Sequence, residues 1–338
     1  MSLSRATVTY ANPMMKVQDF WERGFTGEGV SIGIVDHGIA EHEALPIAGG
    51  HACLQHKTYF YEKGDHHTHC AGIALARNLE NGEPVGIAPN ASHYVIRMYM
   101  STMESRIKSI IEAIDYAIEV GIDILSISQA ITENSARYSN GRTSSLGAPK
   151  HLRLSFRDAF IRAKEAGVIV VVPASSNEDE FNFVELLPKM PNVVAVTNLE
   201  RQDRDLPKAH DYYKRTVSAP GYNIKSIYAD GNYARMSGVS MAVPAVAGML
   251  ALYRQAFPGI SIDTLLDSFY SSAVITEDVP KEIETLGIPQ PPTALYAKPV
   301  TDAIGSLRIY SDYCWVPVES FYKEGNKWKE MEAVGFGK

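Results

Sequence analysis

The sequence lacks an apolar run of the roughly 18–20 residues needed to cross a bilayer, and its first residues lack the apolar stretch of a signal peptide. We therefore expect a cytoplasmic protein, or a secreted one if a leader has been removed. The sequence also lacks an excess of positive charge, since its net charge is −7. This charge gives no reason to expect nucleic acid or an anionic membrane as a partner.

Cysteine is scarce, because the 338 residues contain only Cys53, Cys70 and Cys314. The three are widely spaced and odd in number, and none belongs to a CxxC pair of the kind that holds zinc. Free buried thiols are therefore favoured over a disulfide with one thiol left over. Internal repeats and linkers rich in Gly, Pro or Ser are also missing, so nothing in the composition divides the chain.

Short apolar runs alternate with helical patterns along most of the chain. Nearly continuous Val and Ile strands that are separated by helices indicate a parallel sheet covered on both faces. The predicted fold class is therefore α/β, a doubly wound, mostly parallel sheet flanked by helices. Strands are predicted at residues 30–35, 94–98, 122–127, 168–172 and 193–196, and helices around 107–118 and 156–163, ended by Gly121 and Gly167.

Two polar segments interrupt this pattern. The stretch 132–153 is predicted to be a long surface loop that serves as a lid or a partner contact or is simply mobile. The stretch 277–292, rich in Pro and Glu, is predicted to cross the surface without regular structure.

Four polar residues lie where a predicted strand ends or a predicted helix begins. Asp36 ends the strand 30–35, and Asn177 follows the strand 168–172. His66 lies in the cluster Asp-His-His-Thr-His, and Ser240 precedes a run of small apolar residues. At the carboxyl ends of parallel strands a carboxylate can orient an imidazole. The N–H groups of a helix N-terminus, together with an amide, can bind an oxyanion near a serine nucleophile.

Each of these residues also has a plain structural interpretation. Asp36 and Asn177 are typical of turns, and Ser240 is typical of a helix N-cap. The histidines His66, His67 and His69 favour a zinc site as a further alternative, although no HExxH pattern accompanies them. The combination of all four positions, rather than any one of them, favours a catalytic site.

The motifs around these positions resemble those of the subtilisin family of serine proteases, over residues 21–270. Residues 36–38, Asp-His-Gly, are similar to the family's Asp-Thr/Ser-Gly. Residues 66–72, His-His-Thr-His-Cys-Ala-Gly, are similar to His-Gly-Thr-His-Val/Cys-Ala-Gly. Residues 238–244, Gly-Val-Ser-Met-Ala-Val-Pro, are similar to the highly specific Gly-Thr-Ser-Met-Ala-x-Pro, and the order Asp, His, Ser is the order known for subtilisin.

The resemblance implies a serine endopeptidase with the three-layer subtilisin-like architecture. Ser240 would be the nucleophile, His66 the general base and then acid, and Asp36 the residue that holds the imidazole. Asn177 and the backbone N–H of Ser240 would form the oxyanion hole. The resemblance implies no required cofactor; calcium often stabilises the family, but no EF-hand loop is present to support it.

The resemblance also implies how a polypeptide substrate binds. The segment 125–128 resembles the strand that pairs with an extended substrate, and Ser126, Ser128, Ala130 and Glu178 are the predicted substrate-binding residues. The acidic run that begins at Glu178 favours Lys or Arg at the P1 position of the substrate, or it is a solvated loop. The sequence does not indicate an oligomeric state.

Several residues depart from the family's pattern. His67 replaces a glycine beside His66, and Gln129-Ala130 replaces Leu-Gly. The departures leave one alternative from another class, a catalytically impaired subtilisin-like fold used as a binding or scaffold module. We predict a single catalytic domain over residues 1–338, with residues 271–338 as an extension that packs on it, and no prodomain is visible before the first motif.

Overall fold

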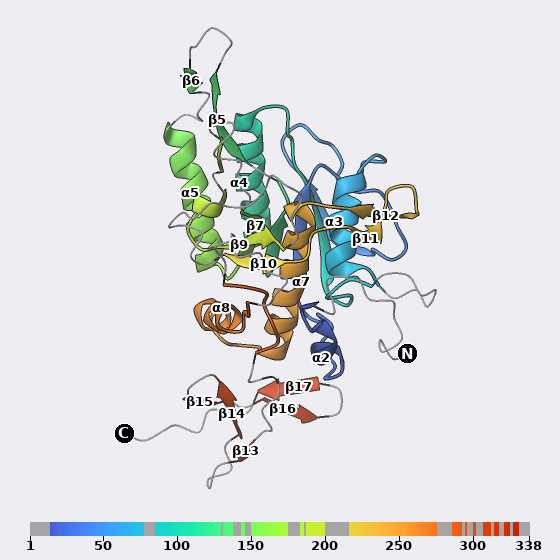
Figure 1. Cartoon of the computed structure of the whole chain (residues 1–338), viewed down its shortest axis with the longest axis vertical. Helices are drawn as coiled ribbons and strands as arrows, with labels where there is room; N and C mark the ends of the chain where they lie inside the picture. Colours follow the sequence, from blue (N-terminus) through green and yellow to red (C-terminus); the bar gives the residue numbers. More distant parts are fainter. Residues whose placement is uncertain are drawn as a thin grey trace. The chain divides into compact units, whose positions relative to one another are not determined.

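The structure is a computed structural model (Figure 1). It forms two compact units, Met1–Gln290 and Pro291–Lys338. Residues 271–290 of the predicted extension belong to the first unit, and the single domain over the whole chain stays a prediction. The described residues are 14–77, 85–129, 131–137, 143–145, 150–174, 183–185, 187–199, 216–275, 286–292, 295, 300–301, 307–311, 314–317, 321–324 and 327–330.

A seven-stranded parallel sheet in the order β10-β9-β7-β4-β1-β3-β2 lies at the centre of the first unit. The sheet extends from β1 on both sides, with β3 and β2 on one and β4, β7, β9 and β10 on the other, which makes it doubly wound and confirms the predicted fold class. Its strands are β1 (Ser31–Asp36), β2 (Ile47–Ala52), β3 (Ser92–Arg97), β4 (Ile124–Ile127), β7 (Ile169–Pro173), β9 (Val193–Asn198) and β10 (Val217–Ala219).

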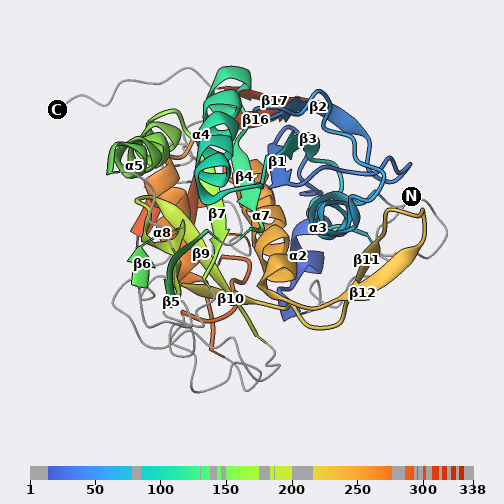
Figure 2. The ribbon, with the colours of Figure 1, turned by 90° about the horizontal axis from the view of Figure 1, so that it is seen from above.

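Helices cover both faces of this sheet, as Figure 2 shows from above. One face carries α4 (Met103–Val120) and α5 (Lys150–Glu165), and the other carries α3 (Asp65–Leu75) and α7 (Val239–Ala256). The shorter helices α2 (Val17–Trp21) and α8 (Ile262–Ser271) complete the unit. None of the helices in the described residues combines the length and apolar character that a membrane crossing needs.

Capping residues and an apolar stripe in the sequence determine where helix α4 begins and ends and which side of it packs on the sheet. Thr102 and Ser105 form a capping box at its start, and Gly121 ends it in the left-handed conformation with φ of 74°. Ile107, Ile110 and other residues of its apolar stripe are fully buried against the sheet and α5. At about 25 cal/mol per Å² of apolar surface, such a stripe stabilises the helix far more than its propensity does.

The two polar segments are not as the sequence predicts. Within 132–153, the described backbone forms β5 (Thr132–Arg137) and β6 (Thr143–Ser145), which join β8 (Phe183–Glu185) in an antiparallel sheet. Helix α5 already begins at residue 150. The prediction of a loop is therefore wrong for these residues, because polar strands carry no apolar alternation that would reveal them.

The end of the predicted surface crossing at 277–292 is buried instead. Ile288 is 1% exposed and pairs with Val274 in an antiparallel bridge. Gln290 is 7% exposed, and its carbonyl accepts a hydrogen bond from the buried Tyr253 hydroxyl. Cys53 and Cys70 are free and buried, as predicted, whereas the side chain of Cys314 lies outside the described part.

Three buried histidines make the fold sensitive to acid. Burial lowers the pKa of His67 and His69 to about 4 and that of His93 to about 3, from an ordinary value of 6.5. Unfolded histidines take up protons below pH 6.5 while the buried rings stay neutral. Their contribution to stability is therefore complete above pH 6.5 and is lost as the pH falls toward 4, by about 1.4 kcal/mol per pH unit for each ring.

Urea unfolding between pH 7.5 and 5 measures this loss. His93 suits the test because neither ring nitrogen has a hydrogen-bond partner in the described structure. We expect His93→Leu to reduce the slope of unfolding free energy against pH by about one proton, or about 1.4 kcal/mol per unit. His42→Gln is the control, and an unchanged slope in His93→Leu would contradict the prediction.

Candidate active site

Asp36 lies at the carboxyl end of β1, in the middle of the sheet, and its side chain is fully buried. Gly38 follows it with φ of 110°, where a Cβ would also meet Tyr61 at 2.8 Å. Gly64, the residue before α3, lies so close that a Cβ there would be 2.2 Å from the Gly38 carbonyl oxygen. These two glycines let the turn after Asp36 pack directly against the start of α3.

His66 is the second residue of α3 and faces Asp36. Its Nδ1 lies 2.6 Å from Asp36 Oδ2, and its side chain is 23% exposed. The Cys70 thiol beside the ring, together with the hydrogen bond and charge of Asp36, raises the pKa of His66, against burial, which lowers it. The pair therefore favours an imidazole whose Nδ1–H donates to the carboxylate.

The other carboxylate oxygen of Asp36 also has partners. Gln129 Nε2 donates to Oδ1 at 2.8 Å, and the His37 backbone N–H donates to it at 2.7 Å. The His37 ring makes an ion pair with the same oxygen and stacks on the His66 ring at 5.7 Å. Burial by itself would raise the pKa of Asp36, but the hydrogen bonds from His37 and His66 hold it far below its ordinary value.

His37 and Gln129 are therefore contacts that the sequence reasoning missed. Both positions differ from the family's pattern, since His37 stands for Thr or Ser and Gln129 for Leu. That difference was the available signal, because a polar residue that replaces an apolar one beside a buried charge often pairs with it.

Ser240 is the second residue of α7, and its hydroxyl donates to the Ser128 carbonyl at 3.2 Å. Among the described contacts, no hydrogen bond joins this hydroxyl to His66. Cys70 contacts both residues. Its Sγ donates to the Ser240 carbonyl at 3.2 Å and lies 3.9 Å from His66 Nδ1. The structure thus brings Asp36, His66 and Ser240 to one end of the sheet, between α3 and α7.

The predicted substrate-binding and oxyanion-hole residues lie in several places. Ser128, just beyond β4, is 3% exposed and accepts from Ser240 as described. Ser126 lies inside β4, which pairs with β1 on one side and β7 on the other, so its backbone is not free to pair with a substrate. That prediction is wrong for Ser126. Asn177, Ala130 and Glu178 lie outside the described residues.

The histidines of the zinc alternative do not converge. His67 is fully buried, and its Nδ1 accepts a hydrogen bond from the Gly38 N–H at 3.3 Å. His69 Nε2 lies 3.0 Å from the Ile224 carbonyl oxygen and 3.2 Å from that of Ala234. His67 is also a helix residue behind the site, so it does not narrow a cleft.

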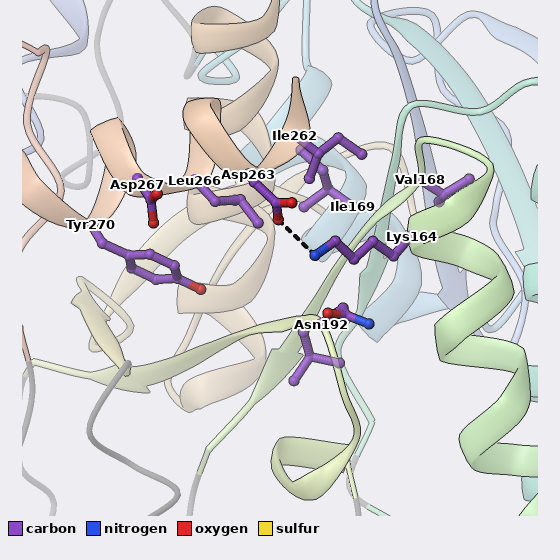
Figure 3. Close-up of a pocket in the computed structure, with 10 residues that line it drawn as sticks. Lys164, Val168, Ile169, Asn192, Ile262, Asp263, Leu266, Asp267 and Tyr270 are labelled. Carbon is purple, nitrogen blue, oxygen red and sulfur yellow. Dashed lines mark ion pairs between the residues drawn. The ribbon is translucent and has the colours of Figure 1, made fainter. Parts of the chain in front are cut away.

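A pocket of about 170 Å³ lies elsewhere in the first unit. It is lined by the end of α5, the starts of β7 and β9, and α8 (Figure 3). Its Lys164 and Asp263 form an ion pair at 2.7 Å, drawn as a dashed line in Figure 3. Because the pocket is at the amino ends of the strands, it is separate from Asp36, His66 and Ser240.

Comparisons with known proteins relate this chain to one family of enzymes. A sequence model described as the subtilase family, peptidase S8, matches residues 27–293. Subtilisin DY of Bacillus licheniformis is 28% identical over 270 residues, which cover 79% of this chain and 92% of that protein. Minor extracellular protease Epr of Bacillus subtilis is 32% identical, with 72% of this chain but only 35% of that protein covered.

A solved structure gives the same fold. The crystal structure of MycP1 from Mycobacterium smegmatis superposes with a TM-score of 0.62 at 17% identity, covering 83% of each chain. Fold, site and comparisons together define a serine-type endopeptidase, a peptide-bond hydrolase. The chain belongs to the subtilase family, which confirms the resemblance found in its motifs.

Gln129 offers a test of the unusual Asp36 environment. We expect Gln129→Leu to lower kcat/KM about fivefold, because one hydrogen bond to a buried charge is worth about 1 kcal/mol or more. The fold should be unchanged by circular dichroism. Gln55→Leu, at an exposed glutamine, is the matched control, and equal losses in both variants would contradict the role of Gln129.

Proposed function

We propose that this protein hydrolyses peptide bonds within extended polypeptide segments, with Asp36, His66 and Ser240 as its catalytic triad. The observation that carries the proposal is the 2.6 Å contact between His66 Nδ1 and the buried Asp36 carboxylate. It fixes the tautomer in which the other ring nitrogen, Nε2, is a proton acceptor. The position of Ser240 at the start of α7 supports its role as nucleophile.

The chemistry follows from these contacts. Rotation about the Cα–Cβ bond of Ser240 turns its Oγ away from the Ser128 carbonyl and toward His66 Nε2. Oγ then attacks the carbonyl carbon of the scissile bond while its proton passes to Nε2, and Nε2 returns that proton to the leaving amine. Water repeats the sequence on the acyl-enzyme and releases the acid. Asp36 stays ionised throughout, because its pKa is held low, and it stabilises the imidazolium.

The tetrahedral oxyanion requires donors at the helix start. The backbone N–H of Ser240, in the first turn of α7, is one candidate, and Asn177 is proposed as the second from its motif. For the substrate we propose backbone pairing along Ser128 and Ala130, beyond the end of β4. The chain runs on there after its pairing with β7 has ended at Ser126, which leaves one edge for a peptide.

The impaired-enzyme alternative is not favoured. Its support was the replaced glycines, but His67 lies inside α3 and contacts Gly38 rather than the cleft. No required cofactor is proposed, and calcium remains without support. For the location, the proposal stays a cytoplasmic protein, or a secreted one if a leader has been removed, and one matched relative is named an extracellular protease.

A fluorophosphonate probe tests the triad directly. We expect wild-type protein to be labelled and Ser240→Ala to be unlabelled. His66→Ala and Ser240→Ala should each lower kcat by about 10⁶-fold, the scale known for subtilisin itself. Ser155→Ala, an exposed serine on α5, should keep full labelling. Labelling of folded Ser240→Ala, or none of folded wild type, would overturn the proposal.

Substrate preference tests the acidic run that begins at Glu178. We propose that it favours a basic P1 residue, because carboxylates near the specificity pocket attract Lys and Arg. We expect higher kcat/KM for Arg-P1 than for Phe-P1 peptides, with the ratio reduced in Glu178→Gln and restored in Glu178→Asp. A clear preference for Phe in the wild type contradicts it.

A further inference from the structure

A cluster of three metal-binding side chains lies between β2 and α4, outside the active site. His51 is in β2, Cys53 follows directly after this strand, and Glu112 projects from α4. One donor atom from each lies within 4.8 Å of the other two: a ring nitrogen, a sulfur and a carboxylate oxygen. We propose that His51, Cys53 and Glu112 form a zinc-binding site.

The donor set and its spacing fit zinc. Imidazole, thiolate and carboxylate are the ligands that Zn²⁺ takes in sites with three protein ligands and a water. Metal–ligand distances of about 2.0–2.3 Å in a tetrahedron place such donors roughly 3.4–3.6 Å apart. His51 Nε2 now lies 2.6 Å from Glu112 Oε1, so the pair would open by under about 1 Å as zinc replaces the shared proton.

Neighbouring groups already orient each ligand. Glu112 Oε2 accepts a hydrogen bond from the Leu54 backbone N–H at 3.1 Å, which leaves Oε1 toward His51. The His51 ring stacks on Tyr116 at 4.9 Å with an interplanar angle of 24°. Cys53 Sγ donates to the Ser109 carbonyl on α4 at 3.5 Å, a hydrogen bond that the thiolate would give up on binding zinc. In known metal sites, contacts of this kind with the ligating side chains hold the ligands in place.

The three side chains differ in their burial. Cys53 is fully buried, while the side chains of His51 and Glu112 are 31% and 34% exposed, so a water could complete the coordination from the solvent side. Zn²⁺ would neutralise both the thiolate and the carboxylate, and binding would release the thiol proton.

This cluster is separate from the catalytic residues. His51 and Cys53 face α4, whereas His66 and Ser240 belong to α3 and α7 on the other face of the sheet. The proposed zinc therefore takes no part in the reaction. Its expected role is to tie the edge strand β2 to α4.

Titration of the metal-free protein with Co²⁺ tests the proposal, because thiolate-bound cobalt has a charge-transfer absorption that carboxylate and imidazole sites lack. We expect one equivalent of Co²⁺ to produce this band, Zn²⁺ to remove it, and Zn²⁺ to raise the thermal midpoint. Cys53→Ser should abolish the band. His51→Ala, at a partly exposed position, should weaken Zn²⁺ binding by about 100-fold or more.

Two controls separate this site from other donors. Cys70→Ser should keep the band, because Cys70 lies beside His66 instead, and His56→Gln should keep normal affinity, because His56 bonds the Met98 carbonyl. A folded wild type without the band, or a band that persists in Cys53→Ser, overturns the proposal. If Cys53→Ser does not fold, unchanged Zn²⁺ affinity in His51→Ala overturns it.

Discussion

The burial of one negative charge, that of Asp36, is the constraint on which the site depends. Moving a carboxylate from water into the protein interior costs free energy unless hydrogen bonds and an opposite charge compensate for the lost solvent. Here both oxygens are used: His66 bonds Oδ2, while Gln129 and the His37 backbone donate to Oδ1. Because these donors come from three separate segments, the sheet must be in its final register before the charge is satisfied. A correctly folded core and an ionised Asp36 therefore require each other.

That requirement explains which strands and turns surround Asp36. Asp36 ends β1, which lies between β3 and β4 in the sheet, and Gln129 follows the end of β4. The tight turn at Gly38 and the close approach of Gly64 then bring α3, and with it His66, over the end of β1. The parallel arrangement thus delivers the carboxylate, the imidazole and the supporting amide to one end of the sheet.

Much of this could be predicted from the sequence, and the failures have physical causes. The apolar strands were predictable because strands buried on both faces are nearly continuous Val and Ile runs, and α4 because its apolar residues repeat with the helical period. The roles of His37 and Gln129 were only hinted at by their departure from the family's pattern, because which carboxylate oxygen each group reaches is a tertiary relation. The buried Ile288 was missed because its Pro-rich neighbourhood is typical of a surface, while its pairing with Val274 comes from distant chain.

The end of β3 links the chain after β2 to the end of β1. The Met98 N–H donates to the Asp36 carbonyl at 2.6 Å, and the Cys53 N–H donates to the carbonyl of the preceding Arg97 at 2.8 Å. The single peptide group between Arg97 and Met98 therefore bonds both the residue that orients the imidazole and the central ligand of the proposed zinc site. Zinc would act here as a structural tie: by fixing Cys53 it fixes the edge that supports β1. The two sites share a scaffold although their side chains never meet.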